Sequence, residues 1–177
     1  MLKGLDDISD DHHRRALPPV EKWDPPFCGD MDLVIQRDGT WMHEGSPIGR
    51  PALVRLFASI LRLDPEGYML VTPVEKLRIQ VEDTPFRAIA AERCDQGWRF
   101  TTDVGDQVVA GPDHALTVGL DPETQEPHPV LHIRRGLMAC IERAVFYDLV
   151  NQAHMRDGQL WLSSGGQEMS LGAVSNG

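Results

Sequence analysis

Residues 68–86, YMLVTPVEKLRIQVEDTPF, decide the fold, because they predict two short strands separated at Thr72 and Pro73. Side chains alternate between the two faces of a strand. The apolar face is then expected to hold Leu77, Ile79 and Val81, and the polar face Lys76, Arg78, Gln80 and Glu82. Glu75 and Asp83 fall on the apolar face. A carboxylate there must be paired, lie beyond the edge of the core, or be reserved for a ligand, because an unpaired buried charge is costly.

Composition narrows the class of protein. The 177 residues are 41% hydrophobic, enough for a real core, and the formal charge is −10 with a pI near 5.0. Such a charge disfavours nucleic-acid and anionic-membrane partners. No window reaches the roughly 20 apolar residues that cross a bilayer, and the N-terminus lacks the apolar centre of a secretion signal. We expect a soluble, cytoplasmic protein.

The pattern predicts two lobes between two tails. We expect a flexible tail over residues 1–16, an N-terminal α+β lobe over 17–85, a β-rich C-terminal lobe with one helix over 86–172, and a tail over 173–177. In the first lobe, Asp38 and Gly39 predict a hairpin between residues 31–37 and 40–44. Apolar residues at helical spacing follow Arg50, and Pro65 and Gly67 end that run.

The second half predicts a meander followed by a helix. Strands are expected at residues 86–94, 98–103, 107–110, 115–120 and 130–133, a helix at residues 137–149, and strands at 160–163 and 168–171. Each half then contains strand, helix and strand pair in one order. The predicted fold class is therefore α+β: two structurally repeated lobes of mainly antiparallel sheet, each with one main helix.

Arginines precede both predicted helices. Arg50 stands before Pro51, and Arg134 and Arg135 stand before Gly136. A helix N-terminus carries partial positive charge, so arginine is unfavourable there unless an anion lies between the guanidinium and the helix end. Two readings stay open: the arginines form structural ion pairs or lie in solvent, or they hold a phosphate or carboxylate ligand between the lobes.

Several other residues could contribute to a site. Trp41 and His43 share a strand face and suit either stacking on a planar ligand or core packing. Lys76 is one of only three lysines beside 14 arginines, and it suits either anion contact or a solvated strand face. Cys28, Cys94 and Cys140 form no C-x-x-C pair, so we expect small buried hydrophobes in place of a disulfide framework or zinc site. We expect no metal and no cofactor.

No catalytic motif is present. The chain lacks a G-x-S-x-G turn, and the Gly-rich run at residues 163–166 precedes a strand instead of a helix. The sequence therefore supports no catalytic residue, and an enzyme is less favoured than a binding protein.

Four segments together resemble one bacterial family, the domain of unknown function 1285. They are CGDMDLVIQRDGTWMHEGSPIGRPALVRLFASIL, YMLVTPVEKLRIQVEDTPF, TTDVGDQVVAGPDHAL and HIRRGLMACIERAVFYDLV. The resemblance implies two repeated lobes, the second loosely like a pleckstrin-homology domain. It also implies a site at the lobe interface for a nucleotide-like ligand and a part in signal transduction. Asp103 replaces a usual Asn, and His128-Pro129-Val130 replaces a common Pro-Tyr-Val.

The family's motifs match this chain at Trp41, Gly45, Pro47, Arg50, Thr72, Pro73, Glu75, Lys76, Asp83, Phe86, Arg134, Gly136 and Arg143. With His43 added from strand pattern, the expected ligand-binding residues are Trp41, His43, Arg50, Thr72, Glu75, Lys76, Asp83, Phe86, Arg134 and Arg143.

We hypothesise a binding protein for a nucleotide-like or other anionic small molecule. Arg50, Lys76 and Arg134 would contact the anion, and Glu75 and Asp83 would hold these cations. Binding would bias the angle between the lobes and give a signal, with a protein partner as a further expectation.

Two alternatives stay open. One is a metal-dependent hydrolase or transferase that acts on a phosphorylated small molecule, with Glu75 or Asp83 as general base. The other is a protein-interaction module that uses an exposed strand edge of the second lobe.

Overall fold

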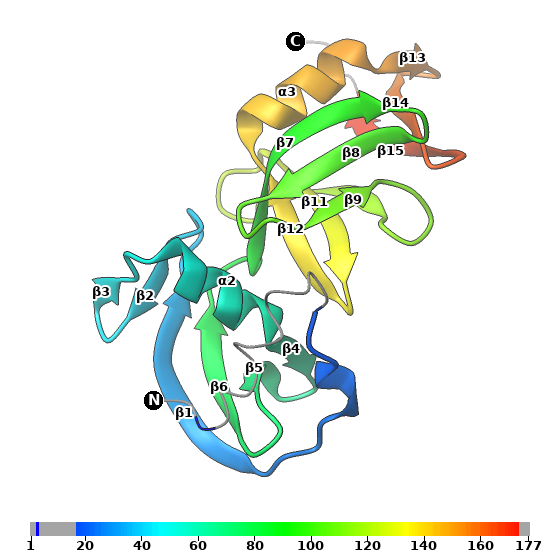
Figure 1. Ribbon diagram of the computed structural model, residues 1–177. Coiled ribbons are helices and arrows are strands. Elements are labelled where there is room, and N and C mark those ends of the chain that lie inside the picture. The colour runs from blue at the N-terminus through cyan, green and yellow to red at the C-terminus, as the bar shows by residue number, and fades with distance from the viewer. Residues whose placement is uncertain (1–2, 4–16, 174–177) are drawn as a thin grey trace. The chain divides into compact units, whose positions relative to one another are not determined.

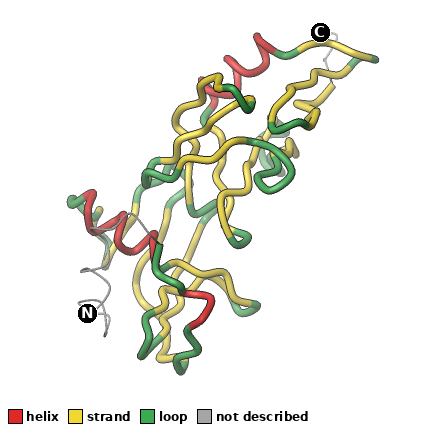
Figure 2. Tube along the Cα trace, turned by 45° about the vertical axis from the view of Figure 1, so that its right-hand side comes forward, coloured by secondary structure: helices red, strands yellow, loops and turns green. Residues whose placement is uncertain are grey.

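Strands dominate the protein. The computed structural model describes Lys3 and residues 17–173. In that part of the chain the helices are the single-turn η2 (Val20–Lys22), α2 (Pro51–Ser59) and α3 (Arg143–Gln152), and the rest is strand or loop (Figure 2). The first six strands are β1 (Phe27–Ile35), β2 (Trp41–His43), β3 (Ser46–Pro47), β4 (Leu61–Asp64), β5 (Gly67–Val71) and β6 (Lys76–Val81). The next six are β7 (Phe86–Cys94), β8 (Gly97–Thr102), β9 (Gln107–Val109), β10 (Leu116–Leu120), β11 (Pro127–Arg134) and β12 (Leu137–Ile141). The last three are β13 (His154–Arg156), β14 (Gln159–Ser164) and β15 (Gln167–Ala173).

The chain divides into two compact units, residues 1–83 and 84–177, which we call the N-lobe and the C-lobe. The N-lobe sheet has the order β3-β2-β1-β6-β5-β4, and the C-lobe sheet has the order β9-β8-β7-β12-β11-β10 (Figure 1). In each lobe two three-stranded antiparallel meanders join through their first and last strands, which run parallel. The predicted duplication into two similar sheet lobes is therefore confirmed.

The helices do not share in this repeat, contrary to the prediction. Helix α2 connects the third and fourth strands of the N-lobe, whereas α3 follows the sixth strand of the C-lobe sheet. The protein is thus mostly β, with a repeated sheet and one differently placed helix in each lobe.

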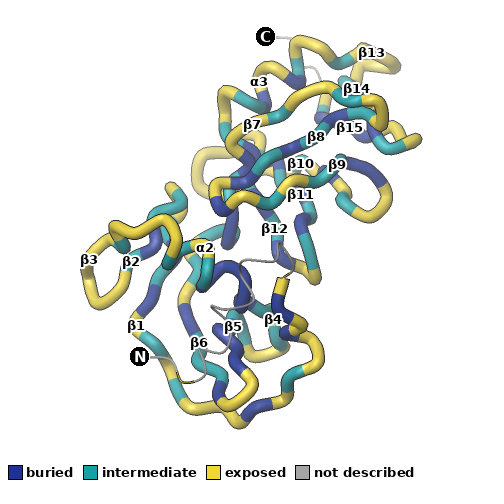
Figure 3. The backbone as a smooth tube through the Cα atoms, viewed as in Figure 1, coloured by how far each residue is buried: buried dark blue, intermediate teal, exposed yellow. Residues whose placement is uncertain are grey.

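The core of the N-lobe follows from strand alternation. Leu33 and Ile35 of β1 and Ile79 of β6 are all buried, and Trp41 pairs with Ile35 on the same face. Buried segments along β1 and β6 are dark blue in Figure 3. The predicted hairpin at Asp38 and Gly39 is confirmed, because Gln36 and Thr40 close it by a backbone hydrogen bond of 2.8 Å. The predicted break between β5 and β6 is confirmed as well.

Helix α2 is shorter than the apolar spacing predicts. It ends at Ser59, and Leu61 already lies in β4, paired with Leu70 of β5. Apolar residues spaced four apart fit a helix. Leu61 and Leu63 are two apart and therefore also fit a strand, and pairing with β5 selects the strand.

The second predicted helix begins later than expected. Residues 137–141 form β12, where Leu137, Ala139 and Ile141 are buried and the residues between them are less so. A spacing of four between Leu137 and Ile141 satisfies both periods, which is why a helix was predicted. Arg135 and Gly136, with φ of 49° and 78°, form the two-residue turn between β11 and β12. Arg134 therefore ends a strand and does not precede a helix.

A third sheet, ordered β13-β14-β15, completes the C-lobe. Strand β15 lies against β10, and β14 lies against β8, while α3 contacts β7 and β14. The buried hydroxyl of Ser164 accepts a hydrogen bond from the Trp98 amide at 2.8 Å and donates one to the Ala110 carbonyl at 2.8 Å. A Cβ on Gly97 would lie 2.3 Å from that hydroxyl, so only glycine fits this junction.

The remaining expectations concern tails, cysteines and membrane spans. The predicted tails lie outside the described residues, except for Lys3 and Ala173. The three cysteines are not buried hydrophobes as predicted: Cys28 is exposed, and Cys94 and Cys140 are half-buried. Among the described residues, no helix is long and apolar enough to cross a membrane.

Candidate anion site

Lys76 belongs to a partly buried cluster of three charges in the N-lobe. The Arg62 guanidinium donates to both carboxylate oxygens of Asp64, at 2.6 and 2.9 Å, and the Lys76 ammonium lies 3.0 Å from Oδ2 of the same carboxylate. The three side chains are only 15%, 10% and 16% exposed. One carboxylate thus serves two cations, and the cluster carries a net charge of +1.

The hydrogen bond from Arg62 is the main cause that holds the pKa of Asp64 below its usual value, although burial opposes it. Arg62 also donates to the carbonyls of Val20 and Trp23, at 2.8 and 2.7 Å. The Arg62–Asp64 pair is therefore anchored on strand β4 and on the segment around η2, independently of Lys76.

A cavity of about 130 Å³ borders this cluster. Its lining residues are Phe27, Glu66, Met69, Lys76 and Arg78. Register explains why they meet: Phe27 of β1 pairs with Lys76, and Met69 of β5 pairs with Arg78. The guanidinium of Arg78 lies 5.6 Å from the centre of the Phe27 ring and 2.6 Å from Asp30. Two cations and an aromatic ring therefore face one small space.

The second predicted cation, Arg134, lies in the C-lobe and is also seated by an aspartate. Its Nε lies 3.2 Å from Oδ1 of Asp106, and its guanidinium carbon lies 5.0 Å from the centre of the Phe86 ring. Phe86 is fully buried, and the side chains of Arg134 and Asp106 are 11% and 17% exposed. The structure thus brings the predicted residues Arg134 and Phe86 together, as a packed ion pair on an aromatic ring.

Thr72 and Glu75 form a tight turn before β6. The Thr72 hydroxyl accepts hydrogen bonds from the amides of Val74 and Glu75, at 3.3 and 3.1 Å. Thr72 is fully buried, so its role in the structure is to close this turn. Glu75 is 8% exposed, and the structure shows no ion pair for its carboxylate within residues 17–173. The carboxylate that holds Lys76 is Asp64, not Glu75 as expected.

The charge of Asp83 acts on Tyr68. Burial raises the pKa of the Tyr68 hydroxyl, and the negative charge of Asp83 raises it further. Asp83 follows the end of β6, the last strand of the N-lobe, by two residues. Neither Asp83 nor Glu75 supplies the carboxylate of the Lys76 or Arg134 pairs described above.

The other predicted residues of the N-lobe lie elsewhere. Trp41 is 3% exposed, and its Nε1 has no hydrogen-bond partner among the described residues. His43 is exposed at the end of β2 and pairs with Leu33. Arg50 caps α2 in an extended conformation, without a capping side chain and without an acid in the first helical turn. Arg50 therefore stands where the sequence predicted, at a helix N-terminus.

Arg143 lines a separate small cavity of the C-lobe. This cavity, of about 110 Å³, is lined by Glu126, Pro127, Pro129, Arg143, Phe146 and Tyr147. The guanidinium of Arg143 pairs with Glu126, and both side chains are more than half exposed. Such a surface pair contributes little to stability and leaves Arg143 open to exchange partners.

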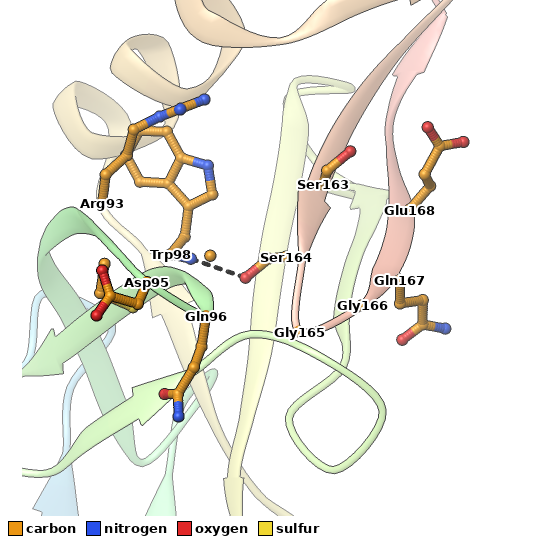
Figure 4. A pocket seen from close by; sticks show the side chains of 12 residues that line it. Arg93, Asp95, Gln96, Trp98, Ser163, Ser164, Gly165, Gly166, Gln167 and Glu168 are labelled. Carbon is orange, nitrogen blue, oxygen red and sulfur yellow. Dashed lines mark hydrogen bonds between the residues drawn. The ribbon is translucent and has the colours of Figure 1, made fainter.

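Two larger cavities flank the junction of the third sheet. One, of about 440 Å³, lies between the β7–β8 and β14–β15 turns, where Arg93 stacks on Trp98 at 5.2 Å (Figure 4). The other, of about 490 Å³, shares Gln96 and Gly165 with it. The shared backbone bond, from the Gly165 amide to the Gln96 carbonyl at 2.8 Å, joins the two turns.

Sequence reasoning missed Arg62, Asp64, Asp106 and Phe27. A signal was available for two of them, because Arg62 and Asp64 stand two apart and so share one face of a strand. The predicted helix extends over both residues, so that alternation is not apparent.

Comparisons with known proteins agree with this architecture. Two family models match: "Domain of unknown function (DUF1285), N-terminal domain" over residues 18–84, and "Protein of unknown function (DUF1285), C-terminal domain" over residues 85–171. No curated protein matches the chain. A crystal structure of a DUF1285 family protein from Silicibacter pomeroyi DSS-3 is 46% identical, with a TM-score of 0.85 over 90% of each chain.

A second crystal structure, of a DUF1285 family protein from Shewanella baltica OS155, is 30% identical. Its TM-score is 0.55, over 69% of this chain and 92% of that chain. The two family models together cover nearly all the described residues. The chain therefore belongs to the DUF1285 family.

Proposed function

We propose that the protein binds an anionic small molecule and that the N-lobe cavity bordered by Lys76 receives its negatively charged group. The observation that carries the proposal is that Lys76, the second cation on a carboxylate already held by Arg62, lines one small space together with Arg78. An anion in the cavity would accept charge-assisted hydrogen bonds from both cations.

The size of the cavity limits what enters it. Ligand pockets for drug-sized molecules span roughly 300–1,000 Å³, whereas this cavity holds about 130 Å³. It accommodates a molecule of the size of a phosphate group or a small organic acid, and not a whole nucleotide. A nucleotide-like ligand would place a phosphate here and extend outward, whereas a small organic acid would fit almost entirely.

Within this proposal the binding event serves a signal, and the protein is not a catalyst. The likeness of the C-lobe to a pleckstrin-homology domain and a cytoplasmic location belong to the same proposal. A six-stranded sheet followed by one helix is consistent with that likeness. A common ligand for Arg50, Lys76 and Arg134 stays a prediction from the sequence.

A thermal-shift panel of inorganic phosphate, AMP, glutarate and glutamate tests the proposal. A single site filled at 100 times its dissociation constant adds about 2.7 kcal/mol of stability, a readily measured rise in melting temperature. Lys76→Met should abolish the rise. Lys22→Met, which removes the same charge from an exposed position outside the cavity, should keep it. No rise with any anion, or an equal rise in Lys76→Met, would refute the proposal.

A further inference from the structure

The charges that line the N-lobe cavity have both signs. Lys76 and Arg78 bring two positive charges, and Glu66 brings one negative charge. Glu66 follows Pro65 in the β4–β5 turn, and its charge acts on both Arg62 and Arg78. A plain anion would meet two cations here but would also be repelled by Glu66.

Both cations can turn to a ligand without stranding a buried charge. The Arg78–Asp30 pair is exposed, with side chains 43% and 66% accessible, so exchange of partners costs little. Lys76 is the second cation on Asp64, and Asp64 keeps its two hydrogen bonds with Arg62 when Lys76 leaves. Two anionic groups of a ligand can therefore be held at once.

The rest of the lining is apolar. Phe27 is 49% exposed, and Met69 is 1% exposed. By the liquid volume of water, roughly 30 Å³ per molecule, the cavity holds the equivalent of about four waters. A short hydrocarbon segment fits between Phe27 and Met69, with charged groups at its ends.

From this arrangement we propose that the ligand class is an acidic α-amino acid such as glutamate or aspartate. Its two carboxylates meet Lys76 and Arg78, its ammonium meets Glu66, and its methylene carbons lie on Phe27 and Met69. The inference rests on the proposed function, that this cavity binds an anion. It adds that the ligand also carries a positive group, which pairs with Glu66.

The sign of one mutational effect distinguishes an amino acid from a plain anion. Glutarate is glutamate without the ammonium, so the two ligands differ only in the group that Glu66 would recognise. Calorimetric titration of Glu66→Gln should show glutamate binding weakened about threefold to fivefold, the range of a solvent-exposed ion pair, and glutarate binding strengthened. Glu123→Gln, an equal charge change in an exposed C-lobe loop, should alter neither affinity.

The outcomes separate this inference from the proposed function. If glutamate fails to bind while phosphate, AMP or glutarate binds and depends on Lys76, the amino-acid assignment is wrong and anion binding stands. Glutamate and glutarate tightening equally in Glu66→Gln would also overturn the assignment. If no anion binds, both proposals fail. Glu66 is exposed in a turn, so its Gln variant should fold, as circular dichroism would verify.

Discussion

The two lobes share a strand order, but the aspartate that pairs with a predicted cation has a different environment in each lobe. In the N-lobe, Asp64 accepts hydrogen bonds from Arg62 and Lys76, and Lys76 also lines a cavity. In the C-lobe, Asp106 accepts from Arg134, which packs on Phe86. Two cations share one aspartate in the N-lobe cluster, whereas Asp106 pairs with the single cation Arg134. A repeated sheet can therefore hold a charged cluster beside a cavity in one copy and a packed ion pair in the other.

The largest expected effect is the loss of folding stability when each of the two aspartates is replaced by asparagine. Asp64→Asn removes the partner of two cations whose side chains are 15% and 16% exposed, so we expect a loss of about 2–4 kcal/mol. Asp106→Asn removes the negative charge beside a single guanidinium that keeps its contact with Phe86, so about 1–3 kcal/mol is expected. Urea unfolding measures both. Asp30→Asn, at an exposed pair, is the control and should cost under about 1 kcal/mol. A greater loss for Asp106→Asn than for Asp64→Asn would break the comparison.

The pH dependence of folding stability is expected to differ between Asp64 of the N-lobe and Asp103, a second aspartate of the C-lobe. The Asp64 pKa is lowered, chiefly by the hydrogen bond from Arg62. The stability that Asp64 contributes is therefore complete above its unfolded pKa of about 3.9 and is lost as pH falls through the folded value. The Asp103 pKa is raised, chiefly by desolvation, although its Oδ1 accepts from the Arg87 amide at 3.0 Å. Asp103 therefore destabilises the fold as pH rises through its folded pKa.

Asp103→Asn tests whether the charge of Asp103 destabilises the fold, because asparagine can accept the same hydrogen bond without a charge. We expect the variant to be more stable than the wild type at pH 7 and equally stable below about pH 3.9, where the aspartate is protonated. Urea unfolding at both pH values measures the difference. A variant that is less stable at pH 7 would show that the charge of Asp103 is favourable.

The smallest expected effect concerns the start of α2. Arg50→Ser should add about 0.5–1 kcal/mol, because serine can cap the free amides and the unfavourable charge at the helix N-terminus is removed. Arg55→Ser, at an exposed position inside the same helix, should not stabilise. Thermal unfolding of the two variants provides the measurement. A destabilised Arg50→Ser would show that the guanidinium makes a favourable contact.

Strand alternation made much of the fold predictable. The hairpin at Asp38 and Gly39, the break at Thr72 and Pro73, and the C-lobe meander all follow from local turn chemistry and period two. Residues 137–141 were misassigned because their apolar spacing fits both periods, and the sheet pairing of β12 with β7 and β11 decides the outcome. Such pairing joins residues far apart in the chain, which local patterns do not contain.

The candidate site was predictable only in part. Lys76 stood out from the sequence, and Arg78 was placed on the same strand face, as the structure confirms. Their partners Asp64 and Phe27 come from other strands, 12 and 49 residues earlier in the chain, and only the register of the sheet brings them together. A single sequence shows which side chains share a strand face, but not which strand lies beside it.

The lysines allow the most direct test of the central claim, that the Lys76 ammonium contacts a bound anion. The chain has only Lys3, Lys22 and Lys76, so selective ¹³C labelling of lysine ε-carbons gives three NMR signals, and Lys76→Met identifies one of them. Titration with glutamate or phosphate should shift the Lys76 signal in a saturable manner and leave the Lys22 signal in place. The claim would be contradicted by a Lys76 signal that does not move at a saturating anion concentration, or by equal small shifts of all three signals.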